Sequence, residues 1–312
     1  MNIIETIKWH FRRFVNQRHC YDFPSELGGW RKYKEPVYGD KNTGDIFDPS
    51  VTLENGVFYL IASERGTGTI ICLESNDGIN WGQRRVLLRG VRNSWQEIVN
   101  RACLIWHNKL WHLWYSGQHN GVSCIGYAQS VDGIVYYSMS ENPVIQATEP
   151  FEGISVMNPS VLWNSEMGKY QMWYSAGDNF EPDVICYAES SDGISWLKYE
   201  KPVLAAYAPH LWEKKKVGGC CVKFDGVHHY TIYYIGYQNL DVARICYAES
   251  SDGITWKRND NNLLLSPSKG GWDADAVYKP SVIRYENTVY LWYNGRKGDE
   301  EYIGLAIKEY DI

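Results

Sequence analysis

Two eleven-residue stretches, 60 residues apart, are identical at ten positions, and this repeat constrains the fold more than any other feature. The copies are CYAESSDGISW, which begins at Cys186, and CYAESSDGITW, which begins at Cys246. Two weaker copies bring the motif to four, and the Asp-Gly pairs of these copies begin at Asp77, Asp132, Asp192 and Asp252. Asp-Gly favours a hairpin turn, because Gly tolerates positive φ and the Asp side chain accepts hydrogen bonds from the nearby backbone. A strand and turn repeated at a nearly fixed period predict a repeat architecture.

A second motif alternates with the first. One copy is NPSVLWNSEMGKYQMWYSAG, in which a short apolar strand, a turn and a second strand rich in aromatic residues follow one another. Five such hairpins begin at Asp48, Arg101, Asn158, Gly218 and Lys279. Each is followed by a strand of the Asp-Gly type, so the chain is expected to be all-β, a five-bladed β-propeller of four-stranded blades.

The fifth Asp-Gly turn is missing, because the chain ends at YIGLAIKEYDI. The outer strand that would follow this turn is found near the start of the chain. There, GGWRKYKEPVYG, which begins at Gly28, resembles GISWLKYEKPVLA, which begins at Gly193. Residues 28–38 are therefore predicted to form the outer strand of the last blade, which closes the ring and removes an open sheet edge. This organisation divides the chain into an N-terminal helix and linker, residues 1–27, and a propeller, residues 28–312.

The first residues follow a helical period. Apolar side chains share one face of the expected helix, and these are Ile3, Ile4, Ile7, Phe11, Phe14 and Val15. Basic residues lie elsewhere on it, namely Lys8, Arg12 and Arg13. The preferred interpretation is a helix packed on the propeller or on a second copy of the chain. The alternative is a basic amphipathic anchor at a membrane surface.

Composition narrows the class of protein. A formal net charge of -6 does not favour a nucleic-acid partner, and 15% aromatic residues suit strands and sugar-binding surfaces. No apolar run reaches the length of a membrane span, and the N-terminus lacks the features of a secretory signal. The eight cysteines show no metal-ligand spacing. We therefore expect reduced thiols, a cytoplasmic protein, and neither a metal nor a cofactor.

The DPSV start at Asp48 and the SxDGxxW hairpins resemble the five-bladed propeller glycosidases, glycoside hydrolase family 43 and its relatives in families 32, 68, 117 and 130. The resemblance covers about residues 28–312. It implies a carbohydrate substrate over the axis of the ring, beside the inner-strand starts and the loops between second and third strands. It also implies catalysis by two carboxyl groups.

The resemblance assigns the first carboxyl group to Asp48, which matches the base of family 43 and the nucleophile of family 32. The second carboxylate of these families is not found at its expected positions, which hold Arg101 and Asn158 or lie near Val217. Glu97, four residues before Arg101, is the best substitute and is the second predicted catalytic residue.

Charged and polar residues at the same end of the blades form the predicted binding site. The predicted substrate-binding residues are Glu64, Arg65, Arg101, His119, Asn158, Asp178, Lys279 and Arg296. Arg binds a carboxylate or phosphate through two hydrogen bonds and Lys adds a point charge, so the carbohydrate is expected to be anionic or phosphate-bearing. The alternative is a buried ion network of Asp48, Arg101 and Lys279 that holds the ring shut.

Three functions remain open at this stage. The first is an enzyme that cleaves or transfers a glycosyl unit at the centre of the propeller, as a glycoside hydrolase does. The second is a glycosyltransferase or phosphorylase that uses a phosphate-bearing or nucleotide-sugar partner in polysaccharide metabolism. The third is a propeller that binds a glycan without turning it over.

Overall fold

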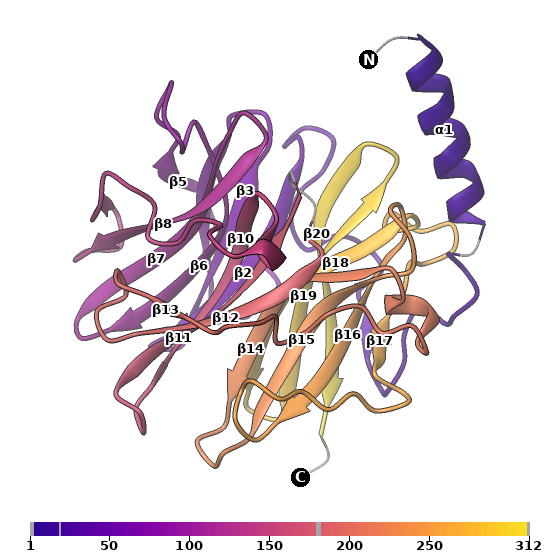
Figure 1. The fold of residues 1–312 in the computed structure, drawn as a ribbon. Helices are drawn as coiled ribbons and strands as arrows, with labels where there is room; N and C mark the ends of the chain where they lie inside the picture. The colour runs from indigo at the N-terminus through magenta and orange to yellow at the C-terminus, as the bar shows by residue number, and fades with distance from the viewer. Residues whose placement is uncertain (1–2, 19, 179–181, 311–312) are drawn as a thin grey trace.

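The computed structural model describes residues 3–18, 20–178 and 182–310 (Figure 1). Within them, helix α1 (Ile3–Gln17) precedes five antiparallel sheets of four strands each, arranged as the blades of a propeller. The first blade contains β2 (Ile46–Glu54), β3 (Val57–Glu64), β4 (Thr69–Ser75) and β5 (Arg85–Arg89). The second contains β6 (Ile98–His107), β7 (Leu110–His119), β8 (Val122–Ser130) and β9 (Tyr137–Ser138).

The remaining blades follow the same order. The third contains β10 (Ser155–Asn164), β11 (Lys169–Gly177), β12 (Val184–Ser190) and β13 (Leu197–Lys198). The fourth contains β14 (Lys216–Phe224), β15 (Tyr230–Tyr237), β16 (Ala243–Ser250) and β17 (Leu263–Leu265). The fifth contains β18 (Ala276–Tyr285), β19 (Thr288–Lys297), β20 (Glu300–Glu309) and, at its outer edge, β1 (Arg31–Lys32). Short 3-10 helices, Pro150–Glu152 and Leu211–Glu213, precede the third and fourth blades. The predicted five-bladed propeller is thus confirmed.

Ring closure follows the predicted scheme. Strand β1 pairs with β20, and Lys32 lies opposite Ala306. In the third blade, Lys198 lies opposite Ala188 in the same way. The start of the chain therefore supplies the strand that the last blade lacks.

The repeated Asp-Gly turn of one blade is hydrogen-bonded by a tryptophan of the neighbouring blade. At the third blade, Ser190 Oγ donates to Asp192 Oδ1 at 2.9 Å, and Asp192 Oδ1 accepts the Ile194 N–H at 2.8 Å. The carbonyl of Gly193 accepts the indole N–H of Trp114, from the second blade, at 2.9 Å. A Cβ on Gly193, at φ 77°, would lie 2.8 Å from that indole ring. Trp173 and Trp292 donate in the same way to the turns of the following blades. The eleven-residue stretch recurs because each copy accepts a hydrogen bond from a tryptophan of the preceding blade.

A second repeated contact fixes the outer strands. In the third blade, Tyr174 Oη donates to the buried Glu152 at 2.7 Å, and Lys198 Nζ pairs with the same carboxylate at 2.7 Å. In the fifth blade, Tyr293 Oη lies 3.1 Å from Asp273 Oδ2, and Lys32 Nζ lies 2.7 Å from the same atom. We call this arrangement of tyrosine, carboxylate and cation the outer-strand latch. The acidic residues that precede these blades are therefore structural.

Helix α1 contacts the propeller through polar residues. Arg12 pairs with Asp241 at 3.3 Å, and Arg13 pairs with Asp275 at 3.0 Å. Phe11 and Phe14 remain 69% and 60% exposed, so these two apolar residues do not pack on the ring. The side chains of Ile3, Ile4 and Ile7 lie outside the described residues. Figure 1 shows the N-terminal end of the helix pointing away from the strands. No helix in the described part of the chain is long and apolar enough to cross a membrane.

Candidate functional site

The first strand of every blade carries one residue in the left-handed backbone region near its start. These residues are Asp48 (φ 56°), Arg101 (φ 52°), Asn158 (φ 56°), Gly219 (φ 38°) and Lys279 (φ 50°). Each lies at a break in the pairing register with the second strand, as expected of a β-bulge. Residues other than glycine seldom adopt this conformation, and such strain is concentrated at functional sites.

The predicted position in the fourth blade is wrong by one residue. Gly218 still pairs with Ile235 in the regular ladder, and the bulge residue is Gly219. The sequence GGCC offers two adjacent glycines. Only the structure shows which of them takes the bulge.

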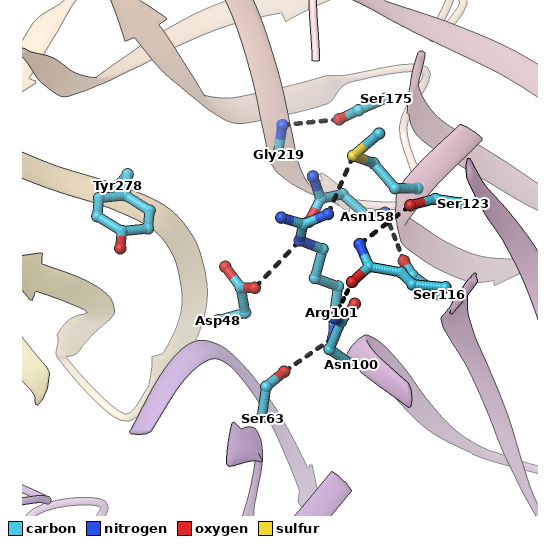
Figure 2. A network of polar contacts seen from close by, with 12 residues as sticks. Asp48, Ser63, Asn100, Arg101, Ser116, Ser123, Asn158, Ser175, Gly219 and Tyr278 are labelled. Carbon is cyan, nitrogen blue, oxygen red and sulfur yellow. Dashed lines mark hydrogen bonds and ion pairs between the residues drawn. The ribbon is translucent and has the colours of Figure 1, made fainter. Parts of the chain in front are cut away.

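Serine hydroxyls from the preceding blade hold three of these bulges in place (Figure 2). The N–H of Arg101 donates to Ser63 Oγ at 2.9 Å, and the N–H of Asn158 donates to Ser116 Oγ at 3.1 Å. The N–H of Gly219 donates to Ser175 Oγ at 2.8 Å. In these three cases, a serine of one blade holds the backbone of the next blade in place at its bulge.

Asp48 is at the centre of the polar network. It is 5% exposed, and Arg101 Nε lies 3.3 Å from its Oδ2. Burial raises the pKa of the Asp48 carboxyl, although the positive charges of Arg101 and Lys279 act in the opposite direction. Lys279 is 3% exposed and pairs with no carboxylate of the described residues. Of the alternative ion network, the described residues show the Asp48–Arg101 pair, without a carboxylate bonded to Lys279.

A cavity of about 270 Å³ opens at this end of the axis. Five of the predicted site residues line it, namely Asp48, Arg65, Arg101, Asn158 and Arg296. Four further polar lining residues were not predicted, namely Tyr237, Asp241, Tyr278 and Glu301. The cavity therefore brings three guanidinium groups and three carboxyl groups together.

The missed carboxylate Glu301 comes from the third strand of the fifth blade. It is 6% exposed, accepts a hydrogen bond from Tyr278 Oη, and pairs with Arg65. In the β19–β20 ladder it lies directly opposite Arg296. That pairing was the available signal, because Arg296 was predicted to be in the site and its cross-strand neighbour shares its location.

The other predicted residues lie outside the cavity lining. Glu97 and His119 bond each other at 2.7 Å and are 39% and 33% exposed. Glu64 pairs with Arg84 and accepts a hydrogen bond from Thr67. Their predicted roles in catalysis and binding gain no support from this geometry and stay predictions.

Asp178 and Lys279 are also outside that lining. Asp178 is exposed, at the end of the third blade's second strand. Lys279 lines a separate space of about 60 Å³ among the first strands of the blades. The burial of its ammonium group beside Asp48 keeps it within electrostatic reach of the cavity.

Several buried polar atoms near the cavity have no hydrogen-bond partner among the described residues. They are Asn100 Oδ1, Asn158 Oδ1, Arg296 Nε and both amide atoms of Asn294. Buried polar atoms are nearly always hydrogen-bonded, so a group of exceptions calls for an explanation. Asn158 and Arg296 line the cavity, and their free acceptor and donor suit a polar ligand.

No protein-family model matches the chain. Over 208 residues it is 27% identical to an uncharacterized protein of Mycobacterium tuberculosis, an alignment that covers 63% of this chain and 67% of that protein. Over 145 residues it is 27% identical to a 1,2-beta-oligomannan phosphorylase of a Thermoanaerobacter species, which covers 42% of this chain and 46% of the phosphorylase. The second alignment thus spans less than half of either protein.

Solved structures resemble the fold over nearly the whole chain. A thermostable family-43 glycoside hydrolase superposes with a TM-score of 0.70 at 19% identity, covering 88% of this chain and 91% of that one. A structure from the family-130 mannoside phosphorylases superposes with a TM-score of 0.68 at 17% identity, covering 91% and 95%. These matches confirm that the chain has the five-bladed propeller fold of the glycoside hydrolases and phosphorylases that its sequence resembles.

Proposed function

We propose that this protein is a carbohydrate-active enzyme that cleaves or transfers a glycosyl unit in the axial cavity. The observation that carries the proposal is the buried Asp48, which lies in a polar cavity with three arginines at the mouth of a five-bladed propeller. The sequence similarity to a phosphorylase and the fold similarity to glycoside hydrolases support the same class of reaction.

Asp48 suits proton transfer to or from a glycosidic oxygen. A carboxyl group whose pKa is raised by burial holds its proton at a higher pH than an exposed one, as a general acid requires. The left-handed backbone at Asp48 and its bond to Arg101 fix the direction of the carboxyl group. Rigid placement of this kind is a large part of enzymatic rate enhancement.

The arginines favour a substrate or co-substrate with a negative charge. Arg65 is paired with Glu301 and Arg101 with Asp48, whereas Arg296 bonds only a backbone carbonyl, that of Asp241, among the described residues. The charge of Arg296 is therefore available to an anion. A phosphate-bearing partner is the second candidate, and the phosphorylase relatives support it.

A thermal-shift screen followed by a turnover assay tests the proposal. Wild type, Asp48→Asn and the exposed control Asp260→Asn would be screened against neutral sugars, uronic acids, inorganic phosphate and nucleotide sugars. A ligand at about 100 times its Kd stabilises the folded state by about 2.7 kcal/mol. We expect a shared binding partner that wild type and Asp260→Asn turn over and Asp48→Asn does not. Binding without turnover by any of the three proteins would instead indicate a glycan-binding propeller.

A further inference from the structure

We propose that Tyr278 is the nucleophile of the axial site and that Glu301 removes its proton. We further propose that the substrate is a glycoside of a carboxylate-bearing sugar, held by the arginines of the cavity. This inference rests on the proposed function and deepens it, because it names the attacking atom and the class of substrate.

The position of Tyr278 is set by the bulge of the fifth blade. It immediately precedes Lys279, the left-handed residue of β18, and its side chain lines the cavity. Its hydroxyl donates to Glu301, which is 6% exposed and lies on β20, separated from β18 by β19 in the sheet. Figure 2 shows Tyr278 on one side of the Asp48 carboxyl group and Arg101 on the other. A substrate in the cavity therefore meets a phenol and a carboxyl group from two different blades.

A hydrogen bond from tyrosine to carboxylate is not by itself a site in this protein. Tyr293 makes the same kind of bond to Asp273 in the same blade, but as part of the outer-strand latch and away from the cavity. The Tyr278–Glu301 pair differs in that both members line the cavity that holds Asp48. The latch pair is therefore a matched control for the cavity pair.

The charges around Tyr278 explain why it needs a base. Burial and the neighbouring Glu301 raise the pKa of Tyr278, with Asp48 acting in the same direction and Arg296 against it. The phenol is consequently neutral at neutral pH and becomes a strong nucleophile only when its proton leaves during attack. Glu301 already accepts that proton in a hydrogen bond.

A neutral nucleophile suits an acidic sugar. A carboxylate that attacked beside the carboxylate of the substrate would meet like-charge repulsion, whereas a phenol that passes its proton to Glu301 brings less charge to the reacting carbon. Arg296, without a carboxylate partner among the described residues, and Asn158, with an unpartnered acceptor, line the same cavity. A sugar that carries both a carboxylate and hydroxyl groups fits these two partners.

The reaction balances in two steps. In the first, Tyr278 Oη bonds to the anomeric carbon, its proton passes to Glu301, and Asp48 protonates the departing glycosidic oxygen, which leaves as an alcohol. In the second, water attacks the anomeric carbon and gives its proton to Asp48, while Tyr278 Oη leaves and recovers its proton from Glu301. The net change is hydrolysis with retained configuration.

Fluorogenic glycosides and mass spectrometry test the inference. The full-length protein would be assayed with 4-methylumbelliferyl glycosides of glucuronic, galacturonic and N-acetylneuraminic acids, and with those of glucose, galactose and mannose. We expect kcat/KM to be at least about 100-fold higher for one of the acidic sugars, since the arginines lose a partner with a neutral one. The fluorinated glycosyl fluoride of that sugar should leave a covalent adduct on Tyr278, located by peptide mass spectrometry.

Variants separate chemistry from folding. Tyr278→Phe should lower kcat at least about 1,000-fold and abolish the adduct. Glu301→Gln should lower kcat about 100- to 10,000-fold. Tyr293→Phe removes the matched phenol of the latch, and it should lower Tm while leaving kcat within about twofold, because the latch lies away from the reacting atoms.

The outcomes distinguish the inference from the proposed function. An adduct on a carboxylate, or full kcat in Tyr278→Phe, would overturn the nucleophile and leave the proposed function intact. Turnover of neutral glycosides alone would overturn the acidic substrate and likewise leave the proposed function intact. Turnover of none of these glycosides, with or without added phosphate, would count against both.

Discussion

Lys32 offers the sharpest test of how the ring is closed. Its side chain is 5% exposed, and its ammonium group lies 2.7 Å from Asp273 Oδ2, whose side chain is 2% exposed. The same ammonium group donates to the Ser268 hydroxyl at 3.0 Å and to the backbone carbonyl of Ser266. Replacing Lys32 with Met keeps the aliphatic part of the side chain and removes the charge. Asp273 would then be a buried carboxylate that retains the Tyr293 hydroxyl but no cation.

The size of the effect follows from this burial. Removing one partner of a buried ion pair costs about 3–5 kcal/mol, because the other charge is left uncompensated. At about 2.1 cal/mol/K per residue, a chain of 312 residues has an unfolding entropy of about 0.66 kcal/mol/K. Lys32→Met should therefore lower Tm by about 5–8 °C. Differential scanning calorimetry measures this shift directly.

The neighbouring residue on the same strand is the control. Arg31 pairs with Glu309 at 2.9 Å, but the two side chains are 63% and 61% exposed. Exposed ion pairs contribute about 0–1 kcal/mol, so Arg31→Met should lower Tm by less than about 2 °C. The double variant Lys32→Met with Asp273→Leu should recover part of the loss, because no unpaired charge remains. Equal shifts for Lys32→Met and Arg31→Met would refute the outer-strand latch as the closing contact.

Four other results are expected. On the alkaline side, activity should fall as pH rises through the raised pKa of Asp48, since its acid form acts first; a rate that stays constant as pH rises above the ordinary carboxyl range would contradict this. Trp292→Phe removes the 2.8 Å bond to the Gly78 carbonyl and should lower Tm by about 2–5 °C, whereas an unchanged Tm would exclude an inter-blade role. Deleting residues 1–38 should abolish cooperative unfolding while deleting residues 1–17 preserves it; equal melts would contradict closure by β1. Thiol titration in denaturant without reductant should count eight free cysteines, and a lower count would contradict the reduced state.

The blades could be predicted because each one repeats a complete local pattern. The Asp-Gly turn, the aromatic second strand and the strand that resembles residues 28–38 each depend on residues close together in sequence. The partners of these patterns could not be predicted in the same way. That Trp114 bonds the Gly193 carbonyl, or that Lys32 pairs with Asp273, depends on which blades are neighbours and on how far each side chain reaches.

The candidate site was predicted where a residue begins a blade or lies at the end of a second strand, as Arg65 and Arg296 do, and it was missed at Tyr278 and Glu301. Asp48, Arg101 and Asn158 were found because they start the repeated motif. Glu301 and Tyr278 were missed because neither occupies a motif position at which a charged residue recurs from blade to blade. The left-handed backbone at the starts of the blades was not predicted, because residues as different as Asp48 and Lys279 adopt it.

The position of a bound sugar tests the central claim most directly. Crystals of the Asp48→Asn variant would be soaked with the glycoside that wild type turns over. We predict a sugar ring in the axial cavity, in contact with Arg101 and with residue 48. A larger groove of about 640 Å³, lined by Trp30, Tyr233 and Tyr247, is the main competing location. A sugar bound only in that groove, with the axial cavity unoccupied, would contradict the assignment of the active site.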